Sequence, residues 1–349
     1  MKKLVLTSLA TIAALTLAGC TGQDSTTESS NELVVSTFAL SEDIVRRDII
    51  EPFEKEEDAH LTLDLGNSAD RFTTLVNNPN ANIDVIELAQ NHSTQGNSDD
   101  LFYDITESEV PNIAYLTPGA REVFENDGGV PITVNSIGII YDPEQVGRSI
   151  DSWEDLWAED LEGRISIPDI SVTAGPLFMH VAALHADSNI AEDKGDGAFE
   201  ALEKLRPNVL RTYQRSSDLA NMFSAGEIKV AVVADFAINM IKEAAPGLRY
   251  VVPESGTFAN FNTINIPKGA QNRELALKFV NYRLSEESQK KKALSLNEGP
   301  INTKVELTSE QAETLTYGEV AERAKPVDFR MINENMSSWI DRWNRTMNA

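Results

Sequence analysis

Cysteine is nearly absent from this sequence, in which Cys20 is the only one among 349 residues. A single thiol cannot form a disulfide within the chain, so the fold must be held together by its core. Histidine is scarce as well, and the four histidines show no spacing typical of metal ligands. His180 and His185, for example, would point about 140° apart on a helix. We therefore expect no disulfide, no metal site and no cofactor.

Positive charge is also in short supply. The sequence has 30 Lys and Arg against 55 Asp and Glu, which gives a formal net charge of -25. Nucleic acids and anionic lipid surfaces are bound through clustered basic residues, so we expect neither as a partner. The acidic residues are spread along the chain without a long block, a pattern typical of a solvated surface.

The common catalytic motifs are missing too. The sequence contains no GxSxG, HExxH, CxxC, GxxxxGK[ST] or GxGxxG. Carboxylates are abundant, but their spacing singles out no pair suited to hydrolysis. We therefore expect a protein that is not an enzyme.

What is present at the start of the chain is an export signal. Lys2 and Lys3 precede an apolar run over residues 4–17 that is too short to span a bilayer. The following Leu17-Ala18-Gly19-Cys20 resembles the lipobox of bacterial lipoproteins, which implies that Cys20 receives a lipid and becomes the new N-terminus. The alternative is an ordinary signal with an accidental cysteine. We expect residues 1–19 to be a signal peptide and residues 20–31 a lipidated cysteine with a flexible, polar tether that holds the protein on the outer face of the cytoplasmic membrane or in the periplasm.

The rest of the chain alternates short strands with amphipathic helices. Strands are predicted at 32–37, 60–65 and 83–88, with helices at 42–56, interrupted near Pro52, and at 69–76. This βαβαβ beginning predicts a parallel sheet, and ligands of such sheets bind beyond the carboxyl ends of the strands. The first candidate solute-binding residues are therefore Thr37, Phe38, Ser68 and Gln90.

A second set of elements follows the strand predicted at 136–141. Ser152 is a predicted helix N-cap. Further helices and strands are predicted at 153–157, 164–167, 175–184, 199–205, 210–212, 217–224, 230–234, 236–244, 250–252, 262–266, 272–284, 285–294 and 329–347. About 330 residues remain after residues 1–19, more than the roughly 250–300 that a single core usually supports, so we expect two lobes. Lobe one would comprise residues 32–137 and 263–349, and lobe two would be an insertion over residues 138–262.

The segment 152–169, SWEDLWAEDLEGRISIPD, places Trp153, Leu156 and Trp157 on one helical face. The whole segment resembles bacterial extracellular solute-binding proteins of the spermidine/putrescine type, and the resemblance continues through residues 205–209, 224–231, 264–270 and 272–281. It implies a two-lobed periplasmic-binding-protein-like fold of type 2, of the α/β class, with a central sheet flanked by helices in each lobe. It further implies crossover hinge strands near 135–138 and 260–263, a cleft that closes on one small-molecule solute, and docking of the loaded protein, expected to be a monomer, on the permease of an ABC importer.

The identity of the solute stays open at this point. A polyamine site needs carboxylates for the ammonium ends and aromatic walls for the methylenes. By resemblance, an aromatic residue and an acid are expected near Asn260 and Asn262, where this chain has amides, and a tyrosine is expected where it has Gln90. Phe38 keeps an aromatic ring at the end of the first strand.

An anionic or neutral solute is the alternative. Ser171 and Thr173 precede a predicted helix whose free N–H groups suit a carboxylate or phosphate, although Thr173 is equally explained as a helix cap. The remaining candidates are not tied to an anionic solute. Asp235 follows a strand and suits an ammonium group, or caps the next helix. The other candidates are Asn135 and Ser136, in the first crossover segment, and Tyr213. A non-transport surface protein and a hydrolase on the same scaffold are the remaining, weaker alternatives.

Overall fold

The computed structural model describes residues 31–347 apart from residues 40 and 128. From Asn31 onward the chain forms one compact unit. The predicted signal peptide, Cys20 and all of the tether except Asn31 lie outside the described residues.

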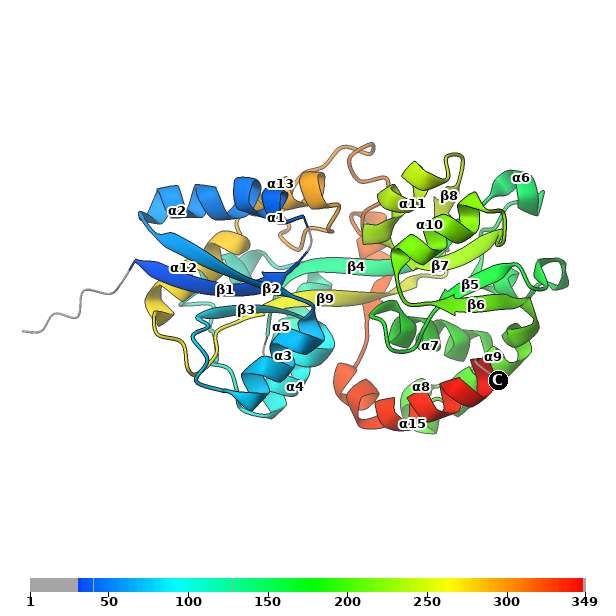
Figure 1. The fold of residues 1–349 in the computed structure, drawn as a ribbon, viewed down its shortest axis with the longest axis horizontal. Helices are drawn as coiled ribbons and strands as arrows, with labels where there is room; N and C mark the ends of the chain where they lie inside the picture. Colours follow the sequence, from blue (N-terminus) through cyan, green and yellow to red (C-terminus); the bar gives the residue numbers. More distant parts are fainter. Residues whose placement is uncertain (1–30, 40, 128, 348–349) are drawn as a thin grey trace, which may run out of the picture. The chain divides into compact units, whose positions relative to one another are not determined.

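Lobe one, as we call the elements around the first three strands, has the predicted βαβαβ order (Figure 1). Strand β1 (Glu32–Phe38) pairs in parallel with β2 (His60–Gly66) on one side and with β3 (Val85–Ala89) on the other. Its first helices are α1 (Glu42–Val45), α2 (Glu51–Glu57) and α3 (Ser68–Asn77). A π-helical turn over Arg46–Ile50 joins α1 to α2. The interruption predicted near Pro52 thus takes the form of a wide turn just before the proline, which cannot donate to the preceding turn.

Two long strands connect this lobe to the rest. Strand β4 (Val130–Tyr141) pairs with β9 (Thr257–Asn265) up to Ser136, and from Ile137 onward it pairs with β7 (Val230–Ala234). Strand β9 also pairs with β3, through residues 262–265. The sheet order is therefore β2-β1-β3-β9-β4-β7-β5-β6, with β10 beside β9 and β8 beside β4. The predicted crossover strands are confirmed, although β9 begins earlier than the strand predicted at 262–266.

Lobe two, the elements around β5, β6 and β7, is again a sheet flanked by helices (Figure 1). Strand β5 (Ile165–Pro168) pairs in parallel with β6 (Val209–Tyr213) and β7. The other elements of this part are β8 (Arg249–Val251), α6 (Pro143–Val146), α7 (Ala174–His185), α8 (Ile190–Asp193), α9 (Asp196–Leu205), α10 (Ser216–Ser224) and α11 (Ile238–Ala244). Ser152 is the predicted N-cap and forms a capping box with Asp155, but the turn it starts, Trp153–Trp157, is a 3-10 helix.

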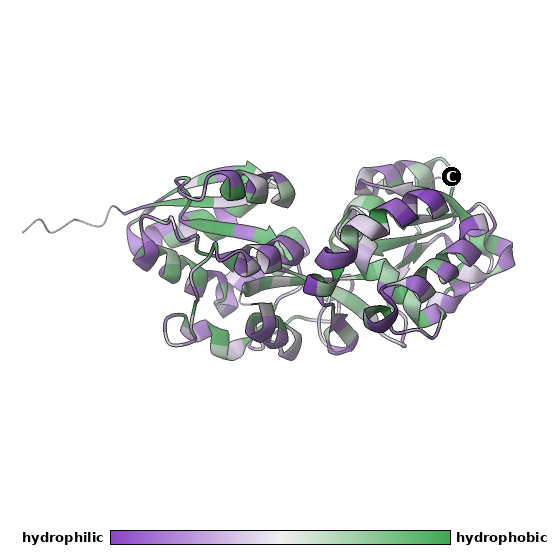
Figure 2. Cartoon of the chain, turned by 90° about the horizontal axis from the view of Figure 1, so that it is seen from below, coloured by the Kyte–Doolittle hydropathy of each residue, from purple (hydrophilic) through white to green (hydrophobic). Residues whose placement is uncertain are grey.

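The remaining elements are α4 (Gln90–Ser98), α5 (Pro118–Asp127), α12 (Arg273–Arg283), α13 (Glu286–Leu296), α14 (Glu319–Arg323), β10 (Ala324–Pro326) and α15 (Phe329–Met347). In Figure 2 the strands are mostly green, whereas the helices around them mix green and purple, as expected for amphipathic helices that cover a sheet. None of the helices within the described residues combines the length and the hydropathy that crossing a bilayer requires.

Helix α15 packs against α4, which follows β3, and places its large buried side chains in the core of lobe two. Its Trp339 and Trp343 are fully buried in the same cluster as Phe199 of α9 and Ile167 of β5. The expectation that all of residues 263–349 belong to lobe one does not account for this packing. We propose that residues 329–347 be assigned to lobe two.

Candidate functional site

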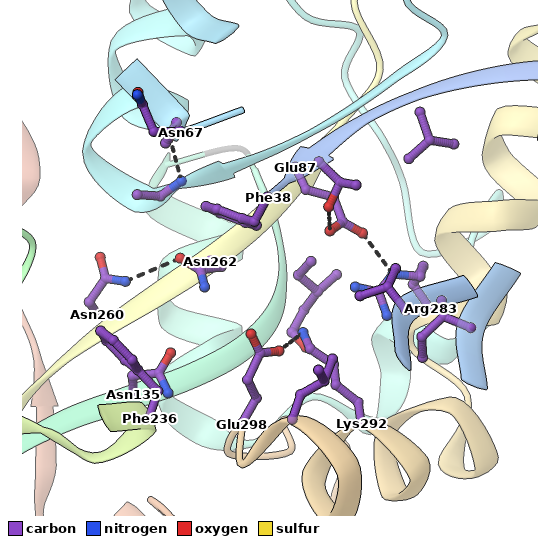
Figure 3. Close-up of a pocket in the computed structure, with 18 of the residues that line it drawn as sticks. Phe38, Asn67, Glu87, Asn135, Phe236, Asn260, Asn262, Arg283, Lys292 and Glu298 are labelled. Carbon is purple, nitrogen blue, oxygen red and sulfur yellow. Dashed lines mark hydrogen bonds and ion pairs between the residues drawn. The ribbon is translucent and has the colours of Figure 1, made fainter. Parts of the chain in front are cut away.

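A cavity of about 310 Å³ lies where β4 and β9 pass between the lobes. Figure 3 shows its lining side chains, which come from β1, β3, β4 and β9, from the starts of α3 and of the turn before α11, and from α12 and α13. Seven of the predicted solute-binding residues line it: Thr37, Phe38, Ser68, Asn135, Thr173, Asn260 and Asn262. Their role as ligands stays a prediction, but the structure brings them to one place.

Amides and aromatic rings form the outer part of this cavity (Figure 3). Asn260 and Asn262 alternate along β9 and therefore face the same side, and Asn135 of β4 is opposite Asn260 in the register. Asn260 Nδ2 donates to Asn262 Oδ1 at 3.4 Å. Asn260 Oδ1 is buried without a hydrogen-bond partner among the described residues. Phe236, which follows β7, is 42% exposed and adds an aromatic ring from lobe two.

Ser68 is held by a small hydrogen-bond network at the start of α3. Its Oγ accepts from Ala89 N at 3.0 Å and lies 2.9 Å from His92 Nδ1. Burial, reinforced by the charge of Arg71, lowers the pKa of His92 to about 4, so its imidazole is neutral at pH 7. Either tautomer of the neutral ring keeps this contact, because the Ser68 hydroxyl can both donate and accept. Arg71, whose guanidinium lies 4.9 Å from the centre of the Phe38 ring, backs this side of the cavity.

Charged side chains form the inner part. Arg283 Nε donates to Glu87 Oε1 at 2.7 Å, and Thr37 Oγ1 donates to Glu87 Oε2 at 2.7 Å. Burial works against ionisation of Glu87, but the charge of Arg283 and these hydrogen bonds outweigh it and hold the pKa of Glu87 below its usual value. Both oxygens of this carboxylate are therefore occupied, in its ionised form.

A second ion pair stands beside the first. Lys292 Nζ lies 2.6 Å from Glu298 Oε2 and 3.4 Å from the carbonyl oxygen of Ile132. Burial and the charge of Arg283 lower the pKa of Lys292 well below its usual value, whereas the charge of Glu87 favours the protonated form. Figure 3 shows both ion pairs on the same side of the cavity.

Sequence reasoning missed most of this inner part. Thr37 was a candidate, but the pairing of Glu87 with Arg283 was not predicted, and Lys292 and Glu298 lie in a segment rich in charge. One signal was available. The buried residues of α12 follow the spacing Ala276, Phe279, Val280, and Arg283 continues that buried face. A charged residue at a position that the helical period assigns to the core is a candidate for a buried site.

Four predicted residues lie beside the cavity rather than in its lining, and each has a partner in the protein. Gln90 is the first residue of α4, and its Oε1 accepts from Phe261 N at 3.2 Å. Ser136 Oγ is hydrogen-bonded to Thr316 Oγ1, Ser171 Oγ donates to Asp169, and the hydroxyl of Tyr213 donates to the carbonyl of Val232. Thr173 does reach the cavity, and its side chain makes no capping hydrogen bond at the start of α7.

Asp235 also lies outside the lining. Its carboxylate accepts from Asn135 Nδ2 at 2.9 Å and from the amide and hydroxyl of Thr316 at 3.0 and 2.5 Å, with Ser136 N at 3.4 Å. Burial raises the pKa of Asp235 to about 6, although these hydrogen bonds favour its ionised form. It forms no side-chain cap of the following turn. The structure thus gives Asp235 contacts that position Asn135, and the direct contact with a solute stays a prediction.

Comparison with known proteins shows which family this chain resembles. The family model described as bacterial extracellular solute-binding protein matches residues 48–316. A crystal structure of an ABC transporter protein from Clostridium perfringens is 46% identical, with a TM-score of 0.85 over 90% of this chain and 99% of that one. Within the described residues, no group of three or more His, Cys, Asp or Glu side chains is arranged to hold a metal ion.

More distant relatives are named for different solutes. The putrescine-binding periplasmic protein SpuD of Pseudomonas aeruginosa is 25% identical over 79% of this chain and 80% of its own length. A gamma-aminobutyric acid-binding protein of Pseudomonas aeruginosa is 24% identical over 63% of this chain and 62% of its own length.

Proposed function

Because the chain belongs to the family of bacterial extracellular solute-binding proteins, we propose that it captures a small solute in the cavity between its lobes and delivers it to the permease of an ABC importer. The observation that carries this proposal is a cavity lined from both lobes at the point where β4 and β9 cross. Two lobes joined by crossing strands can approach or separate, and a solute that contacts both of them stabilises the closed arrangement.

Two classes of solute compete within this function. The names of several relatives favour a polyamine, as does the presence of two carboxylates and three aromatic rings in the lining. Against a polyamine stands the pairing of both carboxylates, Glu87 with Arg283 and Glu298 with Lys292. A doubly cationic solute would have to share carboxylates that are already neutralised.

Attachment to the membrane through lipid on Cys20 is part of the same proposal. It is supported by the apolar run and the lipobox-like Leu17–Cys20 of the sequence. An importer receptor acts outside the cytoplasm, and a lipid anchor would keep it near the permease.

The test is a thermal-unfolding screen of the purified protein against polyamines, amino acids, organic acids, phosphonates and thiamine. A solute at about 100 times its dissociation constant should stabilise the protein by about 2.7 kcal/mol, a readily measured rise in Tm. Absence of any stabilising solute, together with no solute retained during purification, would contradict the proposed function.

A variant pair then locates the site. Phe236→Ala should weaken binding by about tenfold, because an exposed ring that lines the cavity loses its contact with the solute. Met240→Ala is the matched control, since Met240 is also 42% exposed but is not part of the lining. Equal affinities of the two variants would place the solute elsewhere.

A further inference from the structure

The inner part of the cavity contains a hydrogen-bond donor that has no acceptor in the described part of the chain. The side chain of Arg283 is 5% exposed, and its Nη1 is buried without a hydrogen-bond partner anywhere in the described part of the chain. A guanidinium carries five N–H donors and no acceptor. Burying such a donor without an acceptor is unfavourable, so a group that supplies an acceptor here is bound more tightly.

Lys292 adds a second donor of the same kind. Its side chain is also 5% exposed, and its Nζ has two acceptors among the described residues, Glu298 Oε2 and the carbonyl of Ile132. When protonated, this amine has three donors, one more than these two acceptors, although burial lowers its pKa and disfavours the charged form.

The two carboxylates of the inner part each lie against a cation, Glu87 against Arg283 and Glu298 against Lys292. Glu87 receives a hydrogen bond on each oxygen, one from Arg283 and one from Thr37. The two carboxylates and two cations of the lining are formally balanced in charge. Glu298 Oε2 has the ionic contact with Lys292 Nζ but no hydrogen bond among the described residues. The unpaired donor of Arg283 is therefore the feature that favours a hydrogen-bond acceptor on the solute.

The opposite side of the cavity has the complementary feature. Asn260 Oδ1 is a buried acceptor without a partner among the described residues. Figure 3 shows Asn260 and Asn262 on one side of the central space, and Arg283 and Lys292 on the other. An asymmetric solute, with an acceptor group at one end and a donor at the other, would satisfy both sides.

We propose that the solute carries an oxyanion group, a carboxylate or a phosphonate, that accepts hydrogen bonds from Arg283 and Lys292 in the inner part of the cavity. This inference rests on the proposed function and narrows its substrate class. It favours zwitterions and small acids over diamines.

A matched series of solutes tests the charge preference by calorimetric titration. Putrescine, 4-aminobutyrate and succinate share a chain of four carbons and differ in the charges at their ends, and 3-aminopropylphosphonate exchanges the carboxylate for a phosphonate. We expect at least one oxyanion-bearing member to bind about tenfold or more tightly than putrescine, and the phosphonate tells which oxyanion is preferred. Tightest binding of putrescine, or no binding of any oxyanion, overturns the inference.

Variants of the ion pair test the contact itself. The double variant Glu87→Gln/Arg283→Gln removes both charges and so avoids leaving one of them buried alone. Loss of the Glu87 charge by itself would favour an anion, so a fall in the affinity for the oxyanion by about tenfold to a hundredfold would report the loss of Arg283. Unchanged affinity in the folded double variant would overturn the inference.

The control neutralises an ion pair outside the cavity. Asp155→Asn/Arg148→Gln removes the contact of 2.6 Å between Arg148 and Asp155 in lobe two and should leave the affinity unchanged. If the Glu87/Arg283 double variant does not fold, Arg283→Lys is the substitute, because it keeps the charge but loses the planar guanidinium. We then expect the oxyanion to bind severalfold more weakly. An affinity equal to that of wild type would contradict the inference. If only cations stabilise the protein, this inference is wrong but the proposed function stands. If no solute stabilises the protein, the proposed function itself is wrong.

Discussion

At the scale of single residues, Asp235 shows how one carboxylate ties together three segments. It links the end of β7 to Asn135 and Ser136 of β4 and to Thr316, and its own carbonyl accepts from Asn297 Nδ2 at 3.1 Å. These hydrogen bonds favour its ionised form, although burial opposes ionisation. A change in its charge should therefore be felt in the stability of the protein.

The pKa of Asp235 predicts the direction of this effect. Its pKa is raised from 3.8 to about 6, so between these values the folded protein binds more protons than the unfolded chain. The stability contributed by the protonated form is present at low pH and is lost as the pH rises from about 4 to about 6. The change corresponds to about 3 kcal/mol, since one pKa unit is about 1.4 kcal/mol.

The measurement compares wild type with Asp235→Asn, which cannot ionise, by denaturant unfolding between pH 4 and pH 7. The free energy of unfolding of wild type should fall relative to the variant across this range. His92 has the opposite effect in an overlapping range, because burial lowers its pKa, but it is present in both proteins and cancels in the difference. A difference that does not change with pH would show that Asp235 titrates normally.

At the scale of helices and strands, what the sequence could predict depended on hydrophobic periodicity. Strands β1, β2 and β7 and helix α15 have strong patterns and appear where they were expected. Helix α4 was missed because its sequence QNHSTQGNS contains no large apolar residue. Its helical form depends on packing against other parts of the fold, among them β3, β9 and α15.

The residues of the candidate site likewise differ in how far the sequence could predict them. The carboxyl ends of the first strands and the crossover strands, which a general rule for α/β sheets identifies, supplied Thr37, Phe38, Asn135 and Asn260. The inner part joins β3 to α12 and α13, almost 200 residues later in the sequence, as the separation of 196 between Glu87 and Arg283 shows. No local pattern can predict that such distant charges meet.

Helix α15 provides a prediction at this scale. Trp343 is fully buried in the core of lobe two, so Trp343→Ala should lower the free energy of unfolding by about 3–5 kcal/mol. Ile340→Ala is the control on the same helix, because Ile340 is 37% exposed and its replacement should cost much less. Denaturant unfolding measures both, and a stable Trp343→Ala variant would mean that α15 is not part of this core.

At the scale of the whole molecule, the strongly acidic composition contrasts with the paired charges of the cavity. The chain carries a formal net charge of -25, yet the cavity lining pairs its charges and leaves a donor of Arg283 free for a solute. Local hydrogen bonding, rather than the net charge, therefore decides what is bound. Under the proposed function, strands β4 and β9 carry the change in lobe position that an occupied cavity stabilises.

Attachment of the whole molecule to a membrane is tested through its only cysteine. We expect the full chain, produced in a bacterium, to fractionate with membranes, to incorporate a labelled fatty acid and to be released by detergent, because acyl chains on Cys20 contribute about 0.8 kcal/mol per buried CH₂. Cys20→Ser removes the acceptor sulfur and should abolish the labelling. Ser25→Ala, a change in the same polar segment that keeps the thiol, is the control and should behave as wild type. Labelling that persists in Cys20→Ser, or wild-type protein that carries no lipid, would show that the cysteine after the apolar run is accidental and that the receptor acts without an anchor of this kind.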